Sequence, residues 1–293
     1  MAGRIKEHFH LLGELVKIRI ITLVSISCAA GYILAKEALD WGIVVPFFGI
    51  LFLAGASAAL NQLQDTDVDA RMRRTRQRPL PSHRVGTGAV IAIVFSMSII
   101  GAVTLYIGSG ALTMIFGLFA MLMYNAVYTP MKRHTAFAVI PGAVIGAIPP
   151  MVGWVAGDGI WSDSQIMLIA FFLFIWQIPH FWLLFLDSEH DYRRAGLPVI
   201  TDTFSHDQIR RLTFIWMMTA AVTCLMILNF LPINYLIFKV CLLAAGIMLI
   251  WKSFRILLSR DSGELYRTIF IQTNIIVLFV FIFLSVDKLI HFI

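Results

Sequence analysis

Asn61, Asp65 and Asp69 follow one another at intervals of four residues in the segment 61–80, NQLQDTDVDARMRRTRQRPL. On an α-helix a step of four residues turns by about 40°, so these three side chains lie along one face. Carboxylates stacked in this way repel each other unless a cation lies between them. Mg²⁺ prefers such oxygen ligands and keeps positions for water and substrate phosphate. We therefore predict that Asn61, Asp65 and Asp69 form a catalytic magnesium site.

Arginines follow this acidic stripe, and their chemistry suits a multiply charged phosphate. Arg74 and Arg78 carry planar guanidinium groups, which form paired hydrogen bonds with phosphate oxygens. The alternative is a solvated helix whose acids pair with the neighbouring arginines. We favour a metal–diphosphate site, because the stripe begins with Asn61 inside an apolar stretch, where polar groups are functional by default.

A second acidic pair occurs in the segment 176–198, WQIPHFWLLFLDSEHDYRRAGLP. Asp187 and Asp191 repeat the spacing of four residues, and Tyr192 and Arg193 follow directly. Two such sites can hold two Mg²⁺ ions across one diphosphate. We therefore predict that Asp187 and Asp191 are metal ligands, that Asp191 is also catalytic, and that Tyr192 and Arg193 bind substrate.

A third cluster stands in YNAVYTPMKR, at the end of another apolar stretch, and contains Tyr128, Lys132 and Arg133. One interpretation of the two basic residues is that they only orient the chain in the membrane. The other is that Lys132 stabilises the charge of the departing diphosphate while Tyr128 and Arg133 bind substrate. Both interpretations require that this cluster lies on the same side of the membrane as the carboxylates.

The composition shows that these residues belong to a chain whose main solvent is lipid. Of its 293 residues 59% are hydrophobic and only 14% are charged, and the mean hydropathy is +0.84. Soluble domains are about half apolar and about a quarter charged. A soluble globular enzyme, a disordered chain and a disulfide-rich secreted module are thereby excluded. The three cysteines all lie in apolar stretches, as buried packing residues do.

Nine apolar stretches approach the length of about 20 residues that crosses a bilayer. They cover residues 20–36, 42–61, 87–107, 111–128, 136–156, 164–186, 212–230, 233–251 and 268–286. Every Lys and Arg except Lys36, Lys239 and Lys288 falls on one side of this arrangement, and such a bias marks the cytoplasmic side. We expect a multi-pass membrane protein with a cytoplasmic N-terminus, an external C-terminus and no nucleic-acid partner.

We expect residues 1–293 to form a single membrane domain. Its longest connections, residues 62–86 and 187–211, both lie on the cytoplasmic side and carry the two acidic sites. Because long loops in a compact domain are usually functional, we interpret both as catalytic loops. The short N-terminal segment lacks the features of a transit peptide, which favours the inner membrane of a bacterium.

The pattern N-x-x-x-D-x-D-x-D-A-x-M-x-R-T-x-x-R-P-L in residues 61–80 resembles the first aspartate motif of the UbiA-type intramembrane prenyltransferases. Within that superfamily, three stretches are similar to the protohaem IX farnesyltransferase (haem O synthase) family. They are residues 67–80, YTPMKR together with GAIPPMVGW, and WQIPHFW followed by DYRRAGLP. The last of these is the most specific, and it selects haem rather than a quinone ring. The resemblance covers nearly the whole chain.

This resemblance implies an all-α fold, a bundle of nine transmembrane helices around a central cavity open to lipid. The implied reaction transfers a farnesyl group from farnesyl diphosphate to the vinyl group of haem b and adds water, giving haem O and diphosphate. It implies Mg²⁺ as cofactor, haem b as a substrate, and a haem A synthase or terminal oxidase assembly as partners. His180 then either binds the iron or a propionate of haem, or is hydrogen-bonded within the bundle.

Two other functions compete with this one. A member of the same superfamily can prenylate a quinone precursor or another aromatic acceptor. A transporter is the second, but transporters keep their sites near the membrane midplane on interrupted helices. Here the carboxylates gather at one face of the membrane, so transport is disfavoured.

Overall fold

The computed structural model describes residues 2–258 and 263–291, which contain helices and no strand. Within these residues nine helices are long and apolar enough to cross a membrane, which confirms the predicted all-α membrane fold. These spans are Ile18–Lys36, Trp41–Gln64, Thr87–Ser109, Ala111–Met131, Ala136–Ala156, Ser164–Leu184, His206–Phe230, Leu236–Leu258 and Glu264–His291.

The spanning helices form a closed ring of contacts. Each contacts the next along the chain, and the last, α13 (Gly263–His291), also contacts the first, α2 (Ile18–Lys36). The helices between them are α3 (Val44–Gln64), α5 (Thr87–Ser109), α6 (Ala111–Leu122), α8 (Val139–Ala156), α9 (Ser164–Asp187), α11 (His206–Phe230) and α12 (Leu236–Leu258). A ring of this kind brings residues far apart in the sequence to one end of the bundle.

Glycines allow α2 and α8 to approach each other closely. A Cβ added at Gly31 would overlap the backbone of Pro150, and one added at Gly153 would overlap the carbonyl of Cys28. Small residues at a helix interface let backbones pack directly, which replaces the missing hydrophobic drive between helices in lipid. The segment GAIPPMVGW therefore serves as a packing surface, and Cys28 is buried within it.

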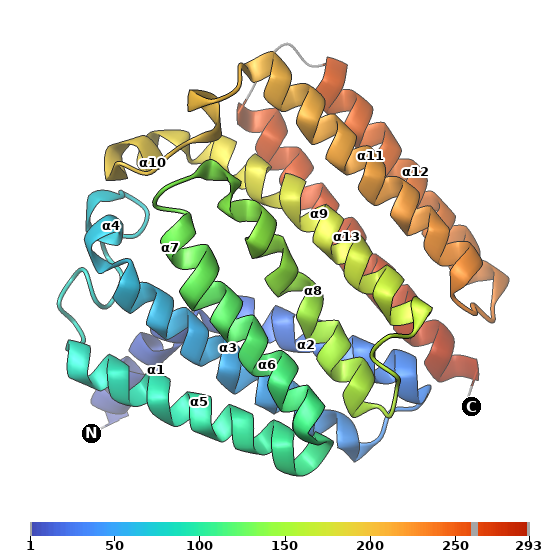
Figure 1. Ribbon diagram of the computed structural model, residues 1–293, viewed down its shortest axis with the longest axis horizontal. Coiled ribbons are helices and arrows are strands. Elements are labelled where there is room, and N and C mark those ends of the chain that lie inside the picture. The colour runs from blue at the N-terminus through green and yellow to red at the C-terminus, as the bar shows by residue number, and fades with distance from the viewer. Residues whose placement is uncertain (1, 259–262, 292–293) are drawn as a thin grey trace.

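The two long connections are more ordered than the hydropathy pattern predicts. Residues 62–86 contain the short helix α4 (Thr66–Arg71), and residues 187–211 contain α10 (Glu189–Ala195) and η4 (Ile200–Asp202). In Figure 1, α4 and α10 lie side by side at the upper left, and the two helices are in contact. Val68 and Met72 pack there against Ala195 and Leu197 in a small apolar cluster. The two predicted catalytic loops thus dock together over one end of the bundle.

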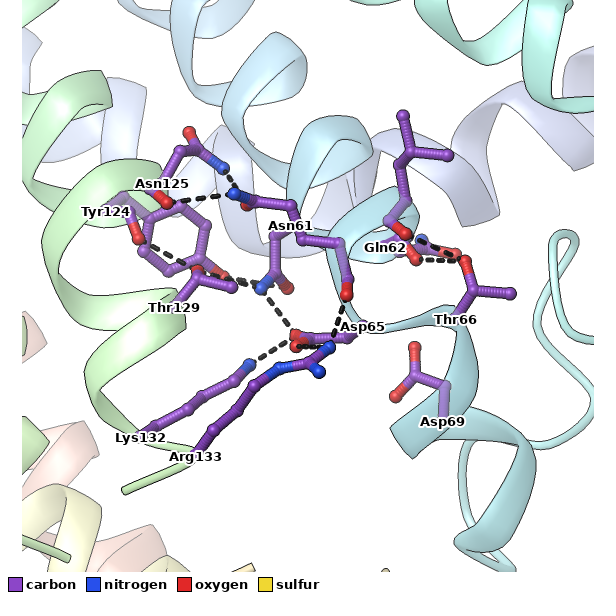
Figure 2. A network of polar contacts seen from close by, with 12 residues as sticks. Asn61, Gln62, Asp65, Thr66, Asp69, Tyr124, Asn125, Thr129, Lys132 and Arg133 are labelled. Carbon is purple, nitrogen blue, oxygen red and sulfur yellow. Dashed lines mark hydrogen bonds and ion pairs between the residues drawn. The ribbon is translucent and has the colours of Figure 1, made fainter. Parts of the chain in front are cut away.

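One spanning helix changes its winding as it approaches the same end. After α6 the chain continues as a π-helical turn, η2 (Met123–Tyr128), and then as α7 (Thr129–Met131). π-Helical turns are rare and occur frequently at functional sites, because they reorient side chains within a continuous helix. This turn carries Tyr124 and Asn125 toward α3 (Figure 2).

Candidate active site

The spacing of Asn61, Asp65 and Asp69 persists although α3 ends before the motif does. Asp65 separates α3 from α4, yet its N–H bonds to the carbonyl of Asn61 at 3.0 Å and its own carbonyl accepts from the N–H of Asp69 at 2.7 Å. The three side chains consequently remain on one side and are each only 3% exposed (Figure 2). The amide of Asn61 donates to Oδ2 of Asp65 at 2.7 Å.

Both buried carboxylates are paired with a cation. Nζ of Lys132 contacts Oδ2 of Asp65, and Nη1 of Arg78 donates to Oδ1 and Oδ2 of Asp69 at 2.9 and 2.7 Å. Two of the predicted basic residues are therefore part of the acidic cluster. The sequence left open that the acids only pair with neighbouring arginines, and this describes Asp69. The partner of Asp65 is instead Lys132, which directly follows α7 (Thr129–Met131).

Arg133 is held by the outer side of the same motif. Its guanidinium bonds to the carbonyl of Gln64 and to Asp67, where Nη2 and Oδ1 are 2.8 Å apart. Partial burial raises the pKa of Asp67, but hydrogen bonding and the charge of Arg133 bring it below its usual value. Arg133 thus ties the end of the fourth span to the start of the acidic loop, and the side chain of Asp67 remains exposed.

The π-helical turn completes the wall opposite α3. The hydroxyl of Tyr124 donates to Oδ1 of Asn61 at 3.3 Å (Figure 2). The side-chain amide of Asn61 in turn donates to Oγ1 of Thr129 at 3.1 Å. The ring of Tyr128 stacks on that of Tyr124, with centroids 5.6 Å apart. On its other side Tyr128 stacks on Phe181 of α9 at 6.0 Å. A row of aromatic faces therefore leads from the acidic cluster into the bundle.

Lys17 belongs to this site although sequence reasoning missed it. It joins α1 (Ala2–Val16) to α2 in the left-handed region, with φ of 57°, and its Nζ donates to Oδ1 of Asn61 at 3.0 Å. Such a backbone conformation costs roughly 1–2 kcal/mol and is typical of functional sites. Burial, together with the charges of Arg78 and Lys132, lowers the pKa of Lys17 to about 7. The only signal in the sequence is a lysine directly before the first apolar stretch.

The second acidic loop reaches the first through Asp191 and Tyr192. Oδ1 of Asp191 accepts a hydrogen bond from the backbone N–H of Arg73 at 3.4 Å. Burial raises the pKa of Tyr192 to about 12, against the opposing field of Arg74 and Arg78. These two arginines therefore lie within electrostatic range of Tyr192, and Arg74 is exposed to solvent. The two loops share one charged surface, as the matching motifs indicate.

The structure does not support the prediction that Arg193 binds substrate. Its guanidinium forms ion pairs with Glu189 at 2.8 Å and with Asp202 at 2.7 Å, and it donates to Thr201 at 2.8 Å. All of these partners belong to its own loop, and they engage three of its five N–H groups. The side chain of Asp187 lies outside the described residues, and its role as a metal ligand stays a prediction.

The described residues bring no three acidic, histidine or cysteine side chains close enough to share a metal ion. What they do present is two buried carboxylates and one amide, which are hard oxygen ligands suited to Mg²⁺. Oδ1 of Asp65 is buried without a hydrogen bond, and Nη2 of Arg133 lies 3.7 Å from it. A buried unpaired carboxylate oxygen is costly unless a cation or water completes it. The site therefore fits Mg²⁺, with substrate phosphate and water as the remaining ligands.

His180 lies inside the bundle, apart from the carboxylates. Its Nδ1 is 2.8 Å from Oδ1 of Asn274 on α13. His180 therefore makes a hydrogen bond between two helices of the bundle, which is one of the two roles that the sequence left open. Its ring contacts Phe181 at 5.6 Å and Phe270 at 4.7 Å. Through Phe181 it joins the row of rings that begins at Tyr124.

The model of the UbiA prenyltransferase family matches residues 24–284. This chain therefore belongs to the UbiA prenyltransferase family. Among solved structures it is similar to a digeranylgeranylglyceryl phosphate synthase, with a TM-score of 0.80 and 15% identity, covering 97% of this chain and 99% of the other. A UbiA homologue from Aeropyrum pernix gives a TM-score of 0.73 at 16% identity, covering 93% and 98%.

Curated relatives narrow the likeness to one branch of this family. A protoheme IX farnesyltransferase from Oleidesulfovibrio alaskensis is 34% identical over 277 residues, which are 94% of this chain and 96% of the relative. One from Anaeromyxobacter dehalogenans is 35% identical and covers 92% of each chain. One from Geobacter sulfurreducens is 40% identical over 184 residues, 62% of this chain and 67% of the relative.

Proposed function

We propose that this protein transfers a farnesyl group from farnesyl diphosphate to the vinyl group of haem b, with addition of water, giving haem O and diphosphate. The relatives named protoheme IX farnesyltransferase, which match more than nine tenths of the chain, support the choice of haem. The observation that carries the diphosphate half is the buried cluster of Asn61, Asp65 and Asp69 with its own cations, Lys132 and Arg78.

Mg²⁺ is the proposed cofactor, held by Asn61, Asp65 and Asp69, with Asp191 and Asp187 of the second loop contributing. When bound, the ion neutralises negative charge on the diphosphate as it leaves. Two structures of a UbiA homologue from Archaeoglobus fulgidus, one with GPP and Mg²⁺ and one with DMAPP and Mg²⁺, support this use of metal. Both share the fold, with TM-scores of 0.68.

The basic residues of the site bind the diphosphate. Lys132 and Arg78 lie against the two carboxylates, so they are within reach of phosphate oxygens bound at the same place. Arg74 adds a further guanidinium from the exposed side of the loop. Each such contact is a charge-assisted hydrogen bond, stronger than a neutral one. Arg133 pairs with Asp67 at 2.8 Å and lies 3.7 Å from Asp65, so it links the exposed carboxylate of the motif to a buried one.

The aromatic row receives the reactive end of the prenyl chain. When the bond between the diphosphate oxygen and the prenyl carbon breaks, the electron pair leaves with the oxygen and an allylic carbocation remains. Tyr124 and Phe181 close the two ends of this row, and the outer faces of their rings attract such a cation and keep water from it, while Tyr128 between them holds the row together. The vinyl group of haem then attacks the prenyl carbon, and water adds to the new cation beside the porphyrin and loses a proton.

The proposed setting is the inner membrane of a bacterium, with residues 1–293 as one domain. The connections 62–86 and 187–211 face the cytoplasm as catalytic loops, and the C-terminus lies outside. Support comes from the distribution of Lys and Arg, of which all but Lys36, Lys239 and Lys288 lie on the proposed cytoplasmic side. A haem A synthase or a terminal oxidase assembly is the proposed receiver of the product.

A product assay tests the reaction. The detergent-solubilised protein is incubated with haem b, farnesyl diphosphate and Mg²⁺, and the haems are separated by chromatography and weighed by mass spectrometry. We expect a later-eluting haem with the mass of the hydroxyethylfarnesyl product, lost with EDTA and restored by excess Mg²⁺. Diphosphate release only when a phenolic acid replaces haem would assign a quinone-type acceptor instead. No diphosphate release with any acceptor would contradict prenyl transfer.

A further inference from the structure

Two small pockets lie next to His180, in the seam between α9 and α13. The deeper pocket is lined by Trp176, His180 and Leu183, with further residues of α9, α11, α12 and α13. The outer pocket is lined by Leu183, Leu184, Arg267, Phe270 and Ile271. Leu183 borders both pockets, so the two form one path from the end of α9 toward the middle of the bundle.

The deeper pocket contains a polar group that the described residues leave unpaired. Nε1 of Trp176 is buried and has no hydrogen-bond partner there. Its ring lies against that of His180, with centroids 4.8 Å apart. Buried polar groups nearly always have a partner, so an unpaired N–H in the lining of a pocket points to a ligand that supplies an acceptor.

The outer pocket ends at an arginine. Arg267 is exposed, and it forms no ion pair or hydrogen bond with residues 2–258 or 263–291. It lies one turn before Phe270 and Ile271 and two turns before Asn274, the partner of His180. Two turns of helix extend about 10 Å along the axis. The path therefore has a positive charge at its outer end and aromatic and imidazole rings at its inner end.

We propose that the seam between α9 and α13 is the binding site of the acceptor, with Arg267 pairing to a carboxylate of the porphyrin at the membrane face and the N–H of Trp176 directed more deeply at the π face of the porphyrin ring. This proposal rests on the proposed function and names where its second substrate lies. Haem b has the matching polarity, because its two propionates occupy one edge and its vinyl groups lie elsewhere on an apolar ring. Burial of a carboxylate is costly, so the propionate edge remains at the polar face beside the arginine.

The position of the seam also suits the reaction. His180 contacts Phe181, which stacks on Tyr128 at the inner end of the row leading from the carboxylates. If the vinyl edge of haem b lies at the depth of His180, it reaches the part of the prenyl chain that lies deeper in the membrane than the diphosphate. The outer pocket opens toward lipid, since Ile271 is 46% exposed. Because the pockets are small, a porphyrin enters only as Leu183, Leu184 and Ile271 change rotamer and the seam widens.

The test compares haem b with its dimethyl ester, in which both carboxylates are blocked. Each ligand is titrated into the detergent-solubilised full chain, and its binding is followed by the change in the Soret band. We expect the wild type to prefer haem b over the ester, and Arg267→Gln to bind haem b about tenfold more weakly while binding the ester unchanged. Trp176→Phe should weaken both ligands alike, because it removes an N–H that does not depend on the charge at Arg267.

Arg211→Gln is the matched control, an exposed arginine near the start of α11 that lines neither pocket. It should bind both ligands as the wild type does, and all variants should retain farnesyl diphosphate binding. If Arg267→Gln keeps the preference for haem b and Trp176→Phe keeps its affinity, the seam is not the acceptor site. Normal binding with no haem product would instead contradict the proposed function and leave the seam supported.

Discussion

Nη1 of Arg78 donates hydrogen bonds to both carboxylate oxygens of Asp69, at 2.9 and 2.7 Å, and Lys132 is paired with Asp65 nearby. Each carboxylate proposed to hold Mg²⁺ thus has its own cation within the chain. Asp65 and Asp69 would hold Mg²⁺ in place of these partners, and Lys132 and Arg78 would then be available to the phosphate oxygens. We infer that metal and diphosphate binding strengthen each other at this site.

Asp65→Asn and Asp69→Asn should each lower the rate of haem O formation by about a hundredfold or more, because each removes a charged ligand of the Mg²⁺ proposed to neutralise the departing diphosphate. Asp67→Asn is the matched control, since Asp67 is in the same motif but is exposed and paired with Arg133. Loss of an exposed ion pair changes free energies by about 1 kcal/mol at most, so its rate should fall by no more than about fivefold. Equal losses in all three variants would contradict the metal assignment.

Lys17→Met should raise the KM for farnesyl diphosphate by about tenfold, because it removes a charge-assisted contact near the phosphates. The thermal midpoint of the protein without substrate should stay the same or rise. The reason is that Lys17 is a buried cation close to Arg78 and Lys132, and these like charges repel one another. A marked drop in the midpoint without any change in KM would make Lys17 a structural residue.

Tyr128→Leu should reduce turnover by about tenfold, whereas Tyr128→Phe should stay near wild type. The ring of Tyr128 lies between those of Tyr124 and Phe181, so it holds this row of rings in place, and the ring rather than the hydroxyl is the property that matters. Both substitutions keep a large apolar side chain, which makes misfolding a poor explanation of a difference. Steady-state rates with saturating haem b and farnesyl diphosphate measure it. A loss in the phenylalanine variant as large as in the leucine variant would assign the role to the hydroxyl.

His180→Ala should weaken haem binding and shift the Soret band, and Asn274→Ala should do so to a smaller degree. Asn274 bonds to Nδ1 and thereby sets which ring nitrogen His180 offers to a ligand. Prenyl diphosphate binding, measured in parallel, should be unchanged in both variants because neither residue lies in the acidic cluster. Unaltered haem affinity and spectrum in His180→Ala would reduce the pair to a contact that only holds α9 against α13.

Arg193→Gln should loosen the second loop without altering substrate affinity. Arg193 connects Glu189, Thr201 and Asp202, and each exposed ion pair contributes about 0.2–1 kcal/mol. Limited proteolysis should therefore cut between residues 187 and 205 faster than in the wild type, while the KM for farnesyl diphosphate changes by less than about twofold. A large rise in KM with an equally resistant loop would restore Arg193 as a substrate ligand.

The positions of the membrane spans could be predicted from hydropathy because lipid imposes the same requirement on every crossing segment. The predicted ends of these spans were less accurate than their positions. The seventh span was expected from residue 212, but α11 begins at His206, where Ser205 and Gln208 form a capping box. The spacing of Asn61, Asp65 and Asp69 predicted helical geometry as far as Asp69, but it gave no sign that α4 and α10 are short separate helices that dock against each other.

The sequence by itself determined the repeat of Asn61, Asp65 and Asp69, because a spacing of four residues depends only on local helix geometry. Only the tertiary structure decided which cation meets Asp65, that Asp191 touches the first loop, and that His180 pairs with Asn274. These partners are separated by 67, 118 and 94 residues along the chain. Such contacts exist because the helices close into a ring, and neither periodicity nor residue type carries that information.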